Sequence, residues 1–284
     1  MVCLLAAFLM AQSATSSANA VITSPAANMY SRPRADADVV SQAVFGANVG
    51  IVKRRGPWLR IRTADSYMGW VTAGSLSKRK PYAAAPPFVQ VESLFANVYR
   101  EADITKHRPV ITVPFEARLE VLPQREEDAR WLTVRLPSGR KAWIQRGDVT
   151  ADPKPRPLAE VVEFSRRFLG LPYLWGGTST FGYDCSGFTQ MLYRRHGVEL
   201  PRDASQQAAW SGLTQVARDQ LRPGDLLYFG DTPDKITHTG MFIGNGAFID
   251  ATPWEHPVVQ IDRLDDPHWS PLFITARRLS EPRR

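Results

Sequence analysis

The pattern of hydrophobic and polar positions changes character near residue 158. Before that point the apolar residues come in short runs, several of them alternating, between Gly, Pro, Asn and Asp; residues 49–52, 58–62 and 69–71 are examples. Alternation with a period of two is typical of half-buried strands, whereas an amphipathic helix needs a period near 3.6. Because no helical period of any length occurs here, the pattern predicts short β-strands through residues 21–150.

This strand-rich part contains an internal repeat. Three features of residues 21–78 recur in the same order within residues 89–150: A-N-M-Y at 27–30 and A-N-V-Y at 96–99, W-L-R-I at 58–61 and W-L-T-V at 131–134, and G-W-V at 69–71 and A-W-I at 142–144. Such a repeat indicates two copies of one unit, here a small β-barrel. Residues 79–88, which are basic and then rich in Ala and Pro, are predicted to link the copies.

The order of features within each copy resembles bacterial SH3-type domains, which often accompany cell-wall enzymes. The resemblance implies that the two copies help to position peptidoglycan. We expect the tryptophans of both copies to belong mostly to the barrel cores: Trp58, Trp70, Trp131 and Trp143. Tyr67, which follows Asp65 closely in the turn D-S-Y-M-G-W, is a better candidate for a contact at the surface.

After a linker with three prolines, residues 151–157, the pattern becomes helical and then returns to strands. Helices are predicted over residues 158–169, which Gly170 ends, over 184–196 and over 203–210. Strands are predicted further on, over residues 225–229, 239–243, 247–251 and 273–279. Helices followed by an antiparallel set of strands are typical of an α+β domain, which we place at residues 158–284.

Composition narrows the class of protein. A chain of 284 residues with 44% hydrophobic residues is long enough for two or three domains and excludes global disorder. A net charge of +7 suits a protein that works near polyanions or an anionic surface. The cations are spread along the chain without a nucleic-acid-binding motif, so we do not expect nucleic acid as a partner. Neither zinc-type nor calcium-type ligand spacing occurs, and we expect no metal and no cofactor.

Residues 1–20 have most features of a cleaved signal peptide. They carry no charge, contain an apolar run over 2–10, and end in A-N-A, which fits the small-residue rule for cleavage after Ala20. The positive segment that usually comes first is missing, and a buried N-terminal helix is the alternative. The apolar run is too short to span a bilayer. We therefore expect an exported protein without a stable membrane span.

Cleavage after Ala20 would leave Cys185 as the single cysteine. An exported protein with one thiol cannot form an internal disulfide, so this thiol is a candidate for chemistry, with a small buried hydrophobe as the alternative. Cys185 falls where the second helix is predicted to start, with Asp184 as its N-cap and Gly187 allowing close backbone approach. Helix N-termini and neighbouring imidazoles favour the reactive thiolate.

His238 is the best candidate for the base that such a thiol needs. It heads the run H-T-G-M-F-I-G-N-G-A-F-I-D-A, which predicts a strand, a tight turn and a second strand. Asp250, twelve residues on, is the candidate that orients the imidazole. A two-residue turn at residues 245–246 would pair Asp250 with Met241, whereas a wider turn centred on Gly244 would place it opposite His238. The sequence leaves the register open, and a bulge or a wider turn is common in such hairpins.

Four runs in this order resemble the NlpC/P60 family of cell-wall peptidases: Y-L-W-G-G with Y-D-C-S-G-F, then L-P-R-D-A-S-Q-Q, R-P-G-D-L-L-Y-F, and the run that begins at His238. The resemblance covers about residues 157–279 and implies a papain-like α+β fold. It also implies cleavage of peptidoglycan stem peptides, most often between γ-D-glutamate and the diamino acid. By resemblance Cys185 is the nucleophile and His238 the general base and acid. Tyr173, Asp184 and Ser186 then line a substrate pocket that binds the free amine of an L-alanyl stem terminus.

Two positions depart from the family pattern. The third catalytic position is commonly His, Asn or Gln, and here Asp250 is interpreted as a working variant. Many relatives carry an acidic residue where this chain has Ala47, so a requirement for a free amine depends on whether Asp65 substitutes for it. Trp175 and Arg202 are further candidates for substrate contact, and for Arg202 a structural salt bridge is the alternative.

The substrate expected from these residues is a peptidoglycan stem peptide or a muropeptide fragment, and the protein is expected to be a monomer. Two other functions stay open. One is an amidase that cuts between muramic acid and L-alanine, and the other is an inactive domain that serves as a wall-binding scaffold.

Overall fold

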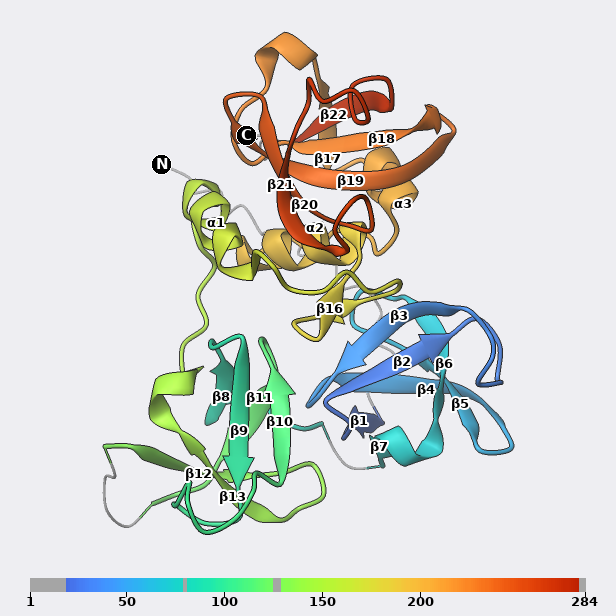
Figure 1. The fold of residues 1–284 in the computed structure, drawn as a ribbon. Coiled ribbons are helices and arrows are strands. Elements are labelled where there is room, and N and C mark those ends of the chain that lie inside the picture. Colours follow the sequence, from blue (N-terminus) through green and yellow to red (C-terminus); the bar gives the residue numbers. More distant parts are fainter. Residues whose placement is uncertain (1–18, 79–80, 125–128, 281–284) are drawn as a thin grey trace, which may run out of the picture.

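The computed structural model describes residues 19–78, 81–124 and 129–280, which form three units in sequence order (Figure 1). Two units are seven-stranded antiparallel sheets, and the third combines helices with a six-stranded antiparallel sheet. All but the last two residues of the expected signal peptide lie outside the described residues. Within the described ranges, no helix has the length and apolar character needed to cross a membrane.

The first sheet takes up residues 20–77 and has the strand order β3-β2-β6-β5-β4-β1-β7. Its strands are β1 (Ala20–Ile22), β2 (Ala26–Tyr30), β3 (Val39–Val44), β4 (Asn48–Arg55), β5 (Trp58–Arg62), β6 (Met68–Thr72) and β7 (Leu76–Ser77). β1 already includes Ala20, which the expected cleavage would remove; this residue is buried and pairs with Val49.

The second sheet repeats the first. Its order, β10-β9-β13-β12-β11-β8-β14, is that of the first sheet with each strand number raised by seven. Its strands are β8 (Phe88–Val91), β9 (Phe95–Tyr99), β10 (Ile111–Pro114), β11 (Arg118–Val121), β12 (Trp131–Arg135), β13 (Lys141–Gln145) and β14 (Val149–Thr150). The repeat in the sequence is therefore a repeat in strand topology.

The prediction that the tryptophans belong mostly to the sheet cores holds in part. Trp70 and Trp131 are buried, Trp58 and Trp143 are partly exposed, and none of the four belongs to the central apolar cluster of its sheet. The cores are built from the alternate positions, which include Leu59, Ile61 and Val71 in the first sheet and Leu132, Val134 and Ile144 in the second. Because successive strand residues face opposite sides, the tryptophans beside them face away from those cores. There Trp58 meets Tyr30 edge to face at 5.4 Å, and Trp131 meets Tyr99 in the same way at 5.5 Å.

The third unit begins with α1 (Leu158–Ser165), which the 3-10 turn Arg166–Phe168 extends. A small hairpin follows, β15 (Thr178–Ser179) and β16 (Gly182–Tyr183), and then α2 (Cys185–Arg195) and α3 (Ala204–Ala209). The sheet has the order β17-β22-β18-β19-β20-β21. Its strands are β17 (Leu213–Val216), β18 (Leu226–Thr232), β19 (Lys235–Gly244), β20 (Ala247–Thr252), β21 (Val258–Arg263) and β22 (Phe273–Leu279).

The central helix α2 carries the core of this unit. It is buried along most of its length and packs against α1 on one side and against β19 and β20 on the other. Phe188, Met191 and Leu192 are fully buried in the cluster between them. The three predicted helices and four predicted strands are all present, while β17 and β21 were not predicted because their apolar positions are few and scattered.

Both sheets are held against α2 by polar contacts. From the second sheet unit, Glu92 pairs with Arg195 at 3.1 Å and Glu116 binds Arg194. From the first, the Gln42 side chain accepts hydrogen bonds from Thr178 and Ser179 of the hairpin. These side-chain contacts cross the boundaries between the units. They hold the two sheets beside the helix that begins at Cys185.

Candidate active site

Cys185 is the first residue of α2. The preceding residue, Asp184, is extended and caps the helix, since its Oδ1 accepts a hydrogen bond from the Gly187 N–H at 2.7 Å. A side chain at Gly187 would place its Cβ 2.2 Å from the Gly177 carbonyl oxygen, so only glycine fits this approach. Cys185 is 8% exposed. The partial positive charge of the helix N-terminus favours a thiolate at this position.

The backbone bulge in β19 decides which residues face Cys185. The tight turn at residues 245–246 pairs Gly244 with Ala247, but a bulge between Phe242 and Gly244 shifts the register by one, so that Phe242 pairs with Phe248. Continued along the ladder, this register places Asp250 opposite Gly240. Both registers considered from the sequence are therefore wrong.

The bulge also puts His238 and Asp250 on the same face. They are diagonal neighbours, two positions apart in the ladder, and side chains two positions apart on a strand share a face. In a regular ladder with Ile243 paired, Asp250 would lie opposite Met241, and His238 and Asp250 would face opposite sides of the sheet. His238 Nε2 contacts Asp250 Oδ2 at 2.6 Å, which leaves Nδ1 as the ring nitrogen available to the thiol.

The electrostatics of this pair favour a charged imidazole. Burial lowers the pKa of His238, but the negative charge at Cys185, the hydrogen bonds to Asp250 and Cys185 and the charge of Asp250 outweigh it and raise the pKa to about 10. Complete burial raises the pKa of Asp250 to about 6, against the opposing effect of His238. Trp269 stacks on the His238 ring at 4.7 Å and helps to fix its plane. The arrangement places the thiol beside an imidazolium that a carboxylate orients, which is the environment that activates a nucleophilic cysteine.

Two of the aromatic candidates lie on the loop before the hairpin. Tyr173 is half-buried, and its backbone N–H donates to the Pro257 carbonyl. Burial raises the pKa of Tyr173, and the negative charges at Cys185 and Asp184 raise it further, which places the phenol close to the nucleophile. Trp175 is 69% exposed and makes no ring contact among the described residues.

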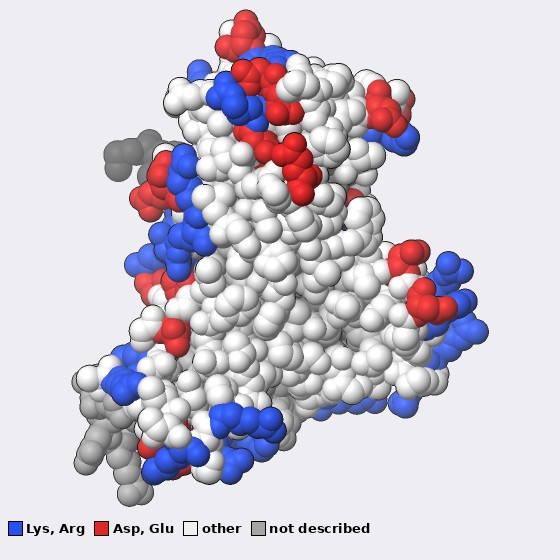
Figure 2. All heavy atoms as spheres, viewed as in Figure 1, with Lys and Arg blue, Asp and Glu red and all other residues white. Residues whose placement is uncertain are grey.

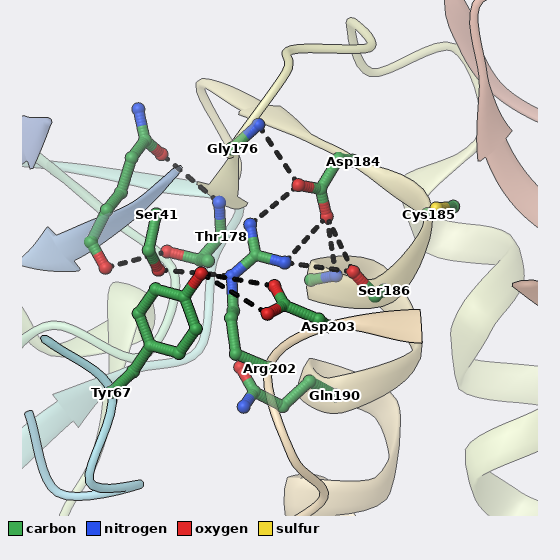
Figure 3. Close-up of polar contacts among 12 residues, drawn as sticks. Ser41, Tyr67, Gly176, Thr178, Asp184, Cys185, Ser186, Gln190, Arg202 and Asp203 are labelled. Carbon is green, nitrogen blue, oxygen red and sulfur yellow. Dashed lines mark hydrogen bonds and ion pairs between the residues drawn. The ribbon is translucent and has the colours of Figure 1, made fainter. Parts of the chain in front are cut away.

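Arg202 forms a bidentate ion pair with the Asp184 carboxylate (Figure 3). Its guanidinium binds Asp184 Oδ2 at 2.6 Å and Oδ1 at 3.0 Å, and it also donates to Ser186 Oγ at 2.9 Å. The same guanidinium donates to Ser41 Oγ of β3 at 3.0 Å, so it ties the first sheet to the cap of the catalytic helix. Arg202 is 3% exposed. Of the two interpretations offered by the sequence, the structure has the buried salt bridge.

Asp203 is a residue that sequence reasoning missed. Its carboxylate accepts hydrogen bonds from the Tyr67 hydroxyl at 3.2 and 3.3 Å and has no other partner among the described residues. Burial raises the pKa of Asp203, and the neighbouring Arg202 acts in the opposite direction. The only signal in the sequence was its place in L-P-R-D-A-S-Q-Q, directly after the arginine. Tyr67, which the sequence suggested for a contact at the surface, is half-buried at this contact between the first sheet unit and the third unit.

Asp65 lies apart from the nucleophile. It accepts hydrogen bonds from Thr63, the Tyr67 backbone and the Gln190 side chain, and in this way it docks the turn between β5 and β6 onto α2. It also lines a cavity of about 410 Å³ where the two sheets meet α2, together with Ala47 and Glu199. Within the described residues no three His, Cys, Asp or Glu side chains are placed to hold a metal ion.

Sequence profiles and curated relatives identify the family of this chain. The profile of the NlpC/P60 family matches residues 170–278, and that of the bacterial dipeptidyl-peptidase SH3 domain matches residues 29–76. A γ-D-glutamyl-L-lysine dipeptidyl-peptidase of Bacillus cereus is 34% identical over 84% of this chain and 74% of the relative. The protein of the same name from Bacillus subtilis is 30% identical over 74% of this chain and 71% of the relative.

A solved structure of a similar protein has the same fold as this chain. The crystal structure of an NlpC/P60 family protein from Bacillus cereus superposes with a TM-score of 0.79, over 92% of this chain and 99% of that chain, at 28% identity. Because the B. cereus relative is more than 30% identical over most of both chains, and because Cys185 and His238 stand in the matched region, the chain belongs to the NlpC/P60 family.

Proposed function

We propose that the protein is an exported cysteine endopeptidase that hydrolyses peptidoglycan stem peptides between γ-D-glutamate and the diamino acid. The observation that carries the proposal is the contact of His238 with Asp250 in a buried position beside the thiol at the start of α2. A helix N-terminus, an imidazole and an orienting carboxylate together supply what a nucleophilic cysteine needs.

The reaction is acyl transfer in two halves. The Cys185 thiolate attacks the γ-carbonyl carbon, and the backbone N–H groups of Cys185 and Ser186, which have no acceptor among the described residues, are placed to bind the oxyanion. As the amide C–N bond breaks, the His238 imidazolium gives its proton to the leaving amine and a thioester remains. Neutral His238 then takes a proton from water, whose oxygen attacks the thioester and releases the acid and the thiol.

The choice of bond rests on the relatives. Two of them bear the name γ-D-glutamyl-L-lysine dipeptidyl-peptidase, which describes removal of a dipeptide whose second residue is linked through its γ-carboxyl group. An N-acetylmuramoyl-L-alanine amidase is the alternative reaction. An inactive scaffold is disfavoured by the close His238–Asp250 contact, since a pair kept only for packing has no need of a buried charge.

A dipeptidyl-peptidase of this kind must recognise the free amine of L-alanine. Asp184 is not available for that amine because Arg202 holds both of its oxygens. Asp203 is the better candidate: its carboxylate is half-buried, hydrogen-bonded only by Tyr67 among the described residues and in no salt bridge with them, and the charge of the neighbouring Arg202 opposes only part of the effect of burial. We therefore assign the amine to Asp203 and Tyr67, with Tyr173 and Ser186 nearer the scissile bond.

The domain organisation proposed with this function is a signal peptide over residues 1–20, two SH3-like β-barrels over 21–78 and 89–150, and a papain-like α+β domain over 158–284. The first barrel contributes Tyr67 to the site and the second supports α2, so both belong to the catalytic body. We propose that the protein acts as a monomer in the cell envelope or outside it.

Digestion of defined peptides tests this proposal. L-Ala-γ-D-Glu-L-Lys-D-Ala and its N-acetylated form would be incubated with the protein, and the products would be identified by mass spectrometry. The expected result is free L-Ala-D-Glu from the first peptide and little from the second. Release of whole stem peptides from a muramoyl substrate would identify the amidase instead, and equal cleavage of both tetrapeptides would remove the role assigned to Asp203.

A further inference from the structure

The net charge of the chain is concentrated in the first sheet. Residues 19–78 contain eight Lys and Arg against three Asp and no Glu, a balance of +5 out of the +7 of the whole chain. Residues 88–150 contain ten cations against nine anions, and residues 158–284 contain thirteen against fifteen. The active-site unit is thus slightly acidic, and neither of the other two units explains the basic character of the protein.

Four of these cations form what we call the basic strip: Lys53, Arg55, Arg60 and Arg62. Lys53 pairs directly with Arg60 across β4 and β5, and Arg55 pairs with Trp58. Arg60 and Arg62 alternate with the core residue Ile61, so they lie on the outer face of the strand. The strip therefore follows two adjacent strands on one face and ends at the tip of their hairpin.

The basic strip lacks compensating acids. None of its members forms an ion pair with a carboxylate of the described residues. Of the three aspartates in this unit, Asp36 is paired with Arg34 and Asp65 is hydrogen-bonded toward α2. Like charges directly opposite on neighbouring strands are destabilising. The facing cations Lys53 and Arg60, which have no carboxylate beside them, therefore destabilise the sheet unless an anion binds over them.

The basic strip also points away from the rest of the molecule. The sheet touches the catalytic unit through β3 and the turn between β5 and β6, whereas β4 is four places from β3 in the strand order. In Figure 2, Lys and Arg lie at the outer edge of the first sheet, at lower right, with Asp or Glu beside some of them, while the centre of this face is free of charge. A partner bound there would not cover the active site.

We propose that the basic strip is a docking surface for a linear anionic polymer linked by phosphodiesters. Cations at alternate positions of a strand recur about every 6.6 Å and form a line, which matches a chain of phosphates better than a plane of headgroups. The large exposed apolar side chains of this unit are Val52 and Met68, while Trp58 and Leu76 are only partly exposed, which leaves little apolar surface for insertion into a bilayer. Docking would hold the enzyme on an envelope polymer with its cleft free for stem peptides.

The test uses the full-length protein and a poly(glycerol phosphate) chain as the probe, with binding measured at 50 and 200 mM salt. Neutralising four phosphates of a flexible strand gives a slope of about −2.8 in log affinity against log salt. Affinity is therefore expected to fall about 50-fold between the two salt concentrations. The variant Lys53→Gln/Arg55→Gln/Arg60→Gln/Arg62→Gln should bind at least twentyfold more weakly at 50 mM salt and lose most of the salt dependence.

A matched control removes four exposed cations from the second sheet unit: Arg100→Gln/Arg108→Gln/Arg140→Gln/Lys141→Gln. This control lowers the net charge equally and should bind within about threefold of the wild-type protein. Both variants should cleave the soluble tetrapeptide at the wild-type rate, because neither touches the cleft. Equal losses in the two variants, unchanged binding in the first, or binding to vesicles with 30% phosphatidylglycerol but not to the polymer would each overturn the proposal. Failure of the wild-type protein to cleave the tetrapeptide would contradict the proposed enzymatic function, and the binding measurements on the basic strip would still stand.

Discussion

The ion pair between Arg202 and Asp184 places a compensated charge next to the nucleophile, and removing one partner at a time changes that charge in a known direction. Arg202→Gln leaves the Asp184 carboxylate without its cation in a site that is 8% exposed. The negative charge then opposes formation of the Cys185 thiolate. Asp184→Asn does the reverse, because the cation of Arg202 is left alone and favours the thiolate.

The size of the effect follows from Coulomb's law. A full charge at a separation of about 5–10 Å, at an effective dielectric constant of about 20, contributes about 1.7–3.3 kcal/mol, or about one to two and a half pH units. The acidic limb of the kcat/KM profile reports formation of the reactive ion pair. It should therefore move up by about one pH unit or more in Arg202→Gln and down by a similar amount in Asp184→Asn.

The double variant separates charge from structure. Arg202→Gln/Asp184→Asn restores a neutral pair, and its acidic limb should return close to the wild-type position. Removing one partner of a buried ion pair costs about 3–5 kcal/mol of stability, so Arg202→Gln is expected to unfold at lower denaturant concentration than the double variant. The other two variants keep the test available if Arg202→Gln does not fold.

The assay is the pH dependence of kcat/KM for a soluble tetrapeptide between pH 4 and 9, with product release followed by chromatography. Opposite displacements of the limb in the two single variants would support the electrostatic role of Arg202. Limbs that stay in place, or that move in the same direction in both single variants, would refute it and leave Arg202 as a purely structural link to Ser41.

Two further predictions follow from the site. In Asp250→Asn the pKa of His238 loses one of the interactions that raise it, so the basic limb of the kcat/KM profile, where the imidazolium is lost, should move down by about one to two pH units; an unmoved limb would count against Asp250. Asp203→Asn should raise KM for the free-amine tetrapeptide about tenfold or more without affecting the slow cleavage of its N-acetylated form, and equal effects on both peptides would contradict the assignment.

Local pattern was enough to predict most elements that surround the site. The spacing of apolar residues predicted α1 and α2, and the cap residue Asp184 predicted where α2 begins. The strands β20 and β22 were predicted within a residue or so because their apolar runs are short and well bounded. These features depend on neighbours within a few positions, which a sequence displays directly.

The remaining features depend on residues far apart in the chain. The bulge at Ile243 is decided by how β19 packs and pairs on both sides, and one extra residue changes which side chains share a face. Arg202 meets Ser41 across 161 positions, and Tyr67 meets Asp203 across 136. Trp58 and Trp143 were misplaced because their hydrophobicity outweighed their alternation with Leu59 and Ile144, which take the core positions.

The most direct test of the central claim compares the wild-type protein with Cys185→Ala on L-Ala-γ-D-Glu-L-Lys-D-Ala. Circular dichroism and thermal unfolding would establish that the variant is folded, and mass spectrometry would follow the products. The structure predicts that the wild-type protein releases L-Ala-D-Glu and that the folded variant releases none above the uncatalysed background. Undiminished release by folded Cys185→Ala would contradict the assignment of the nucleophile and, with it, the proposed mechanism.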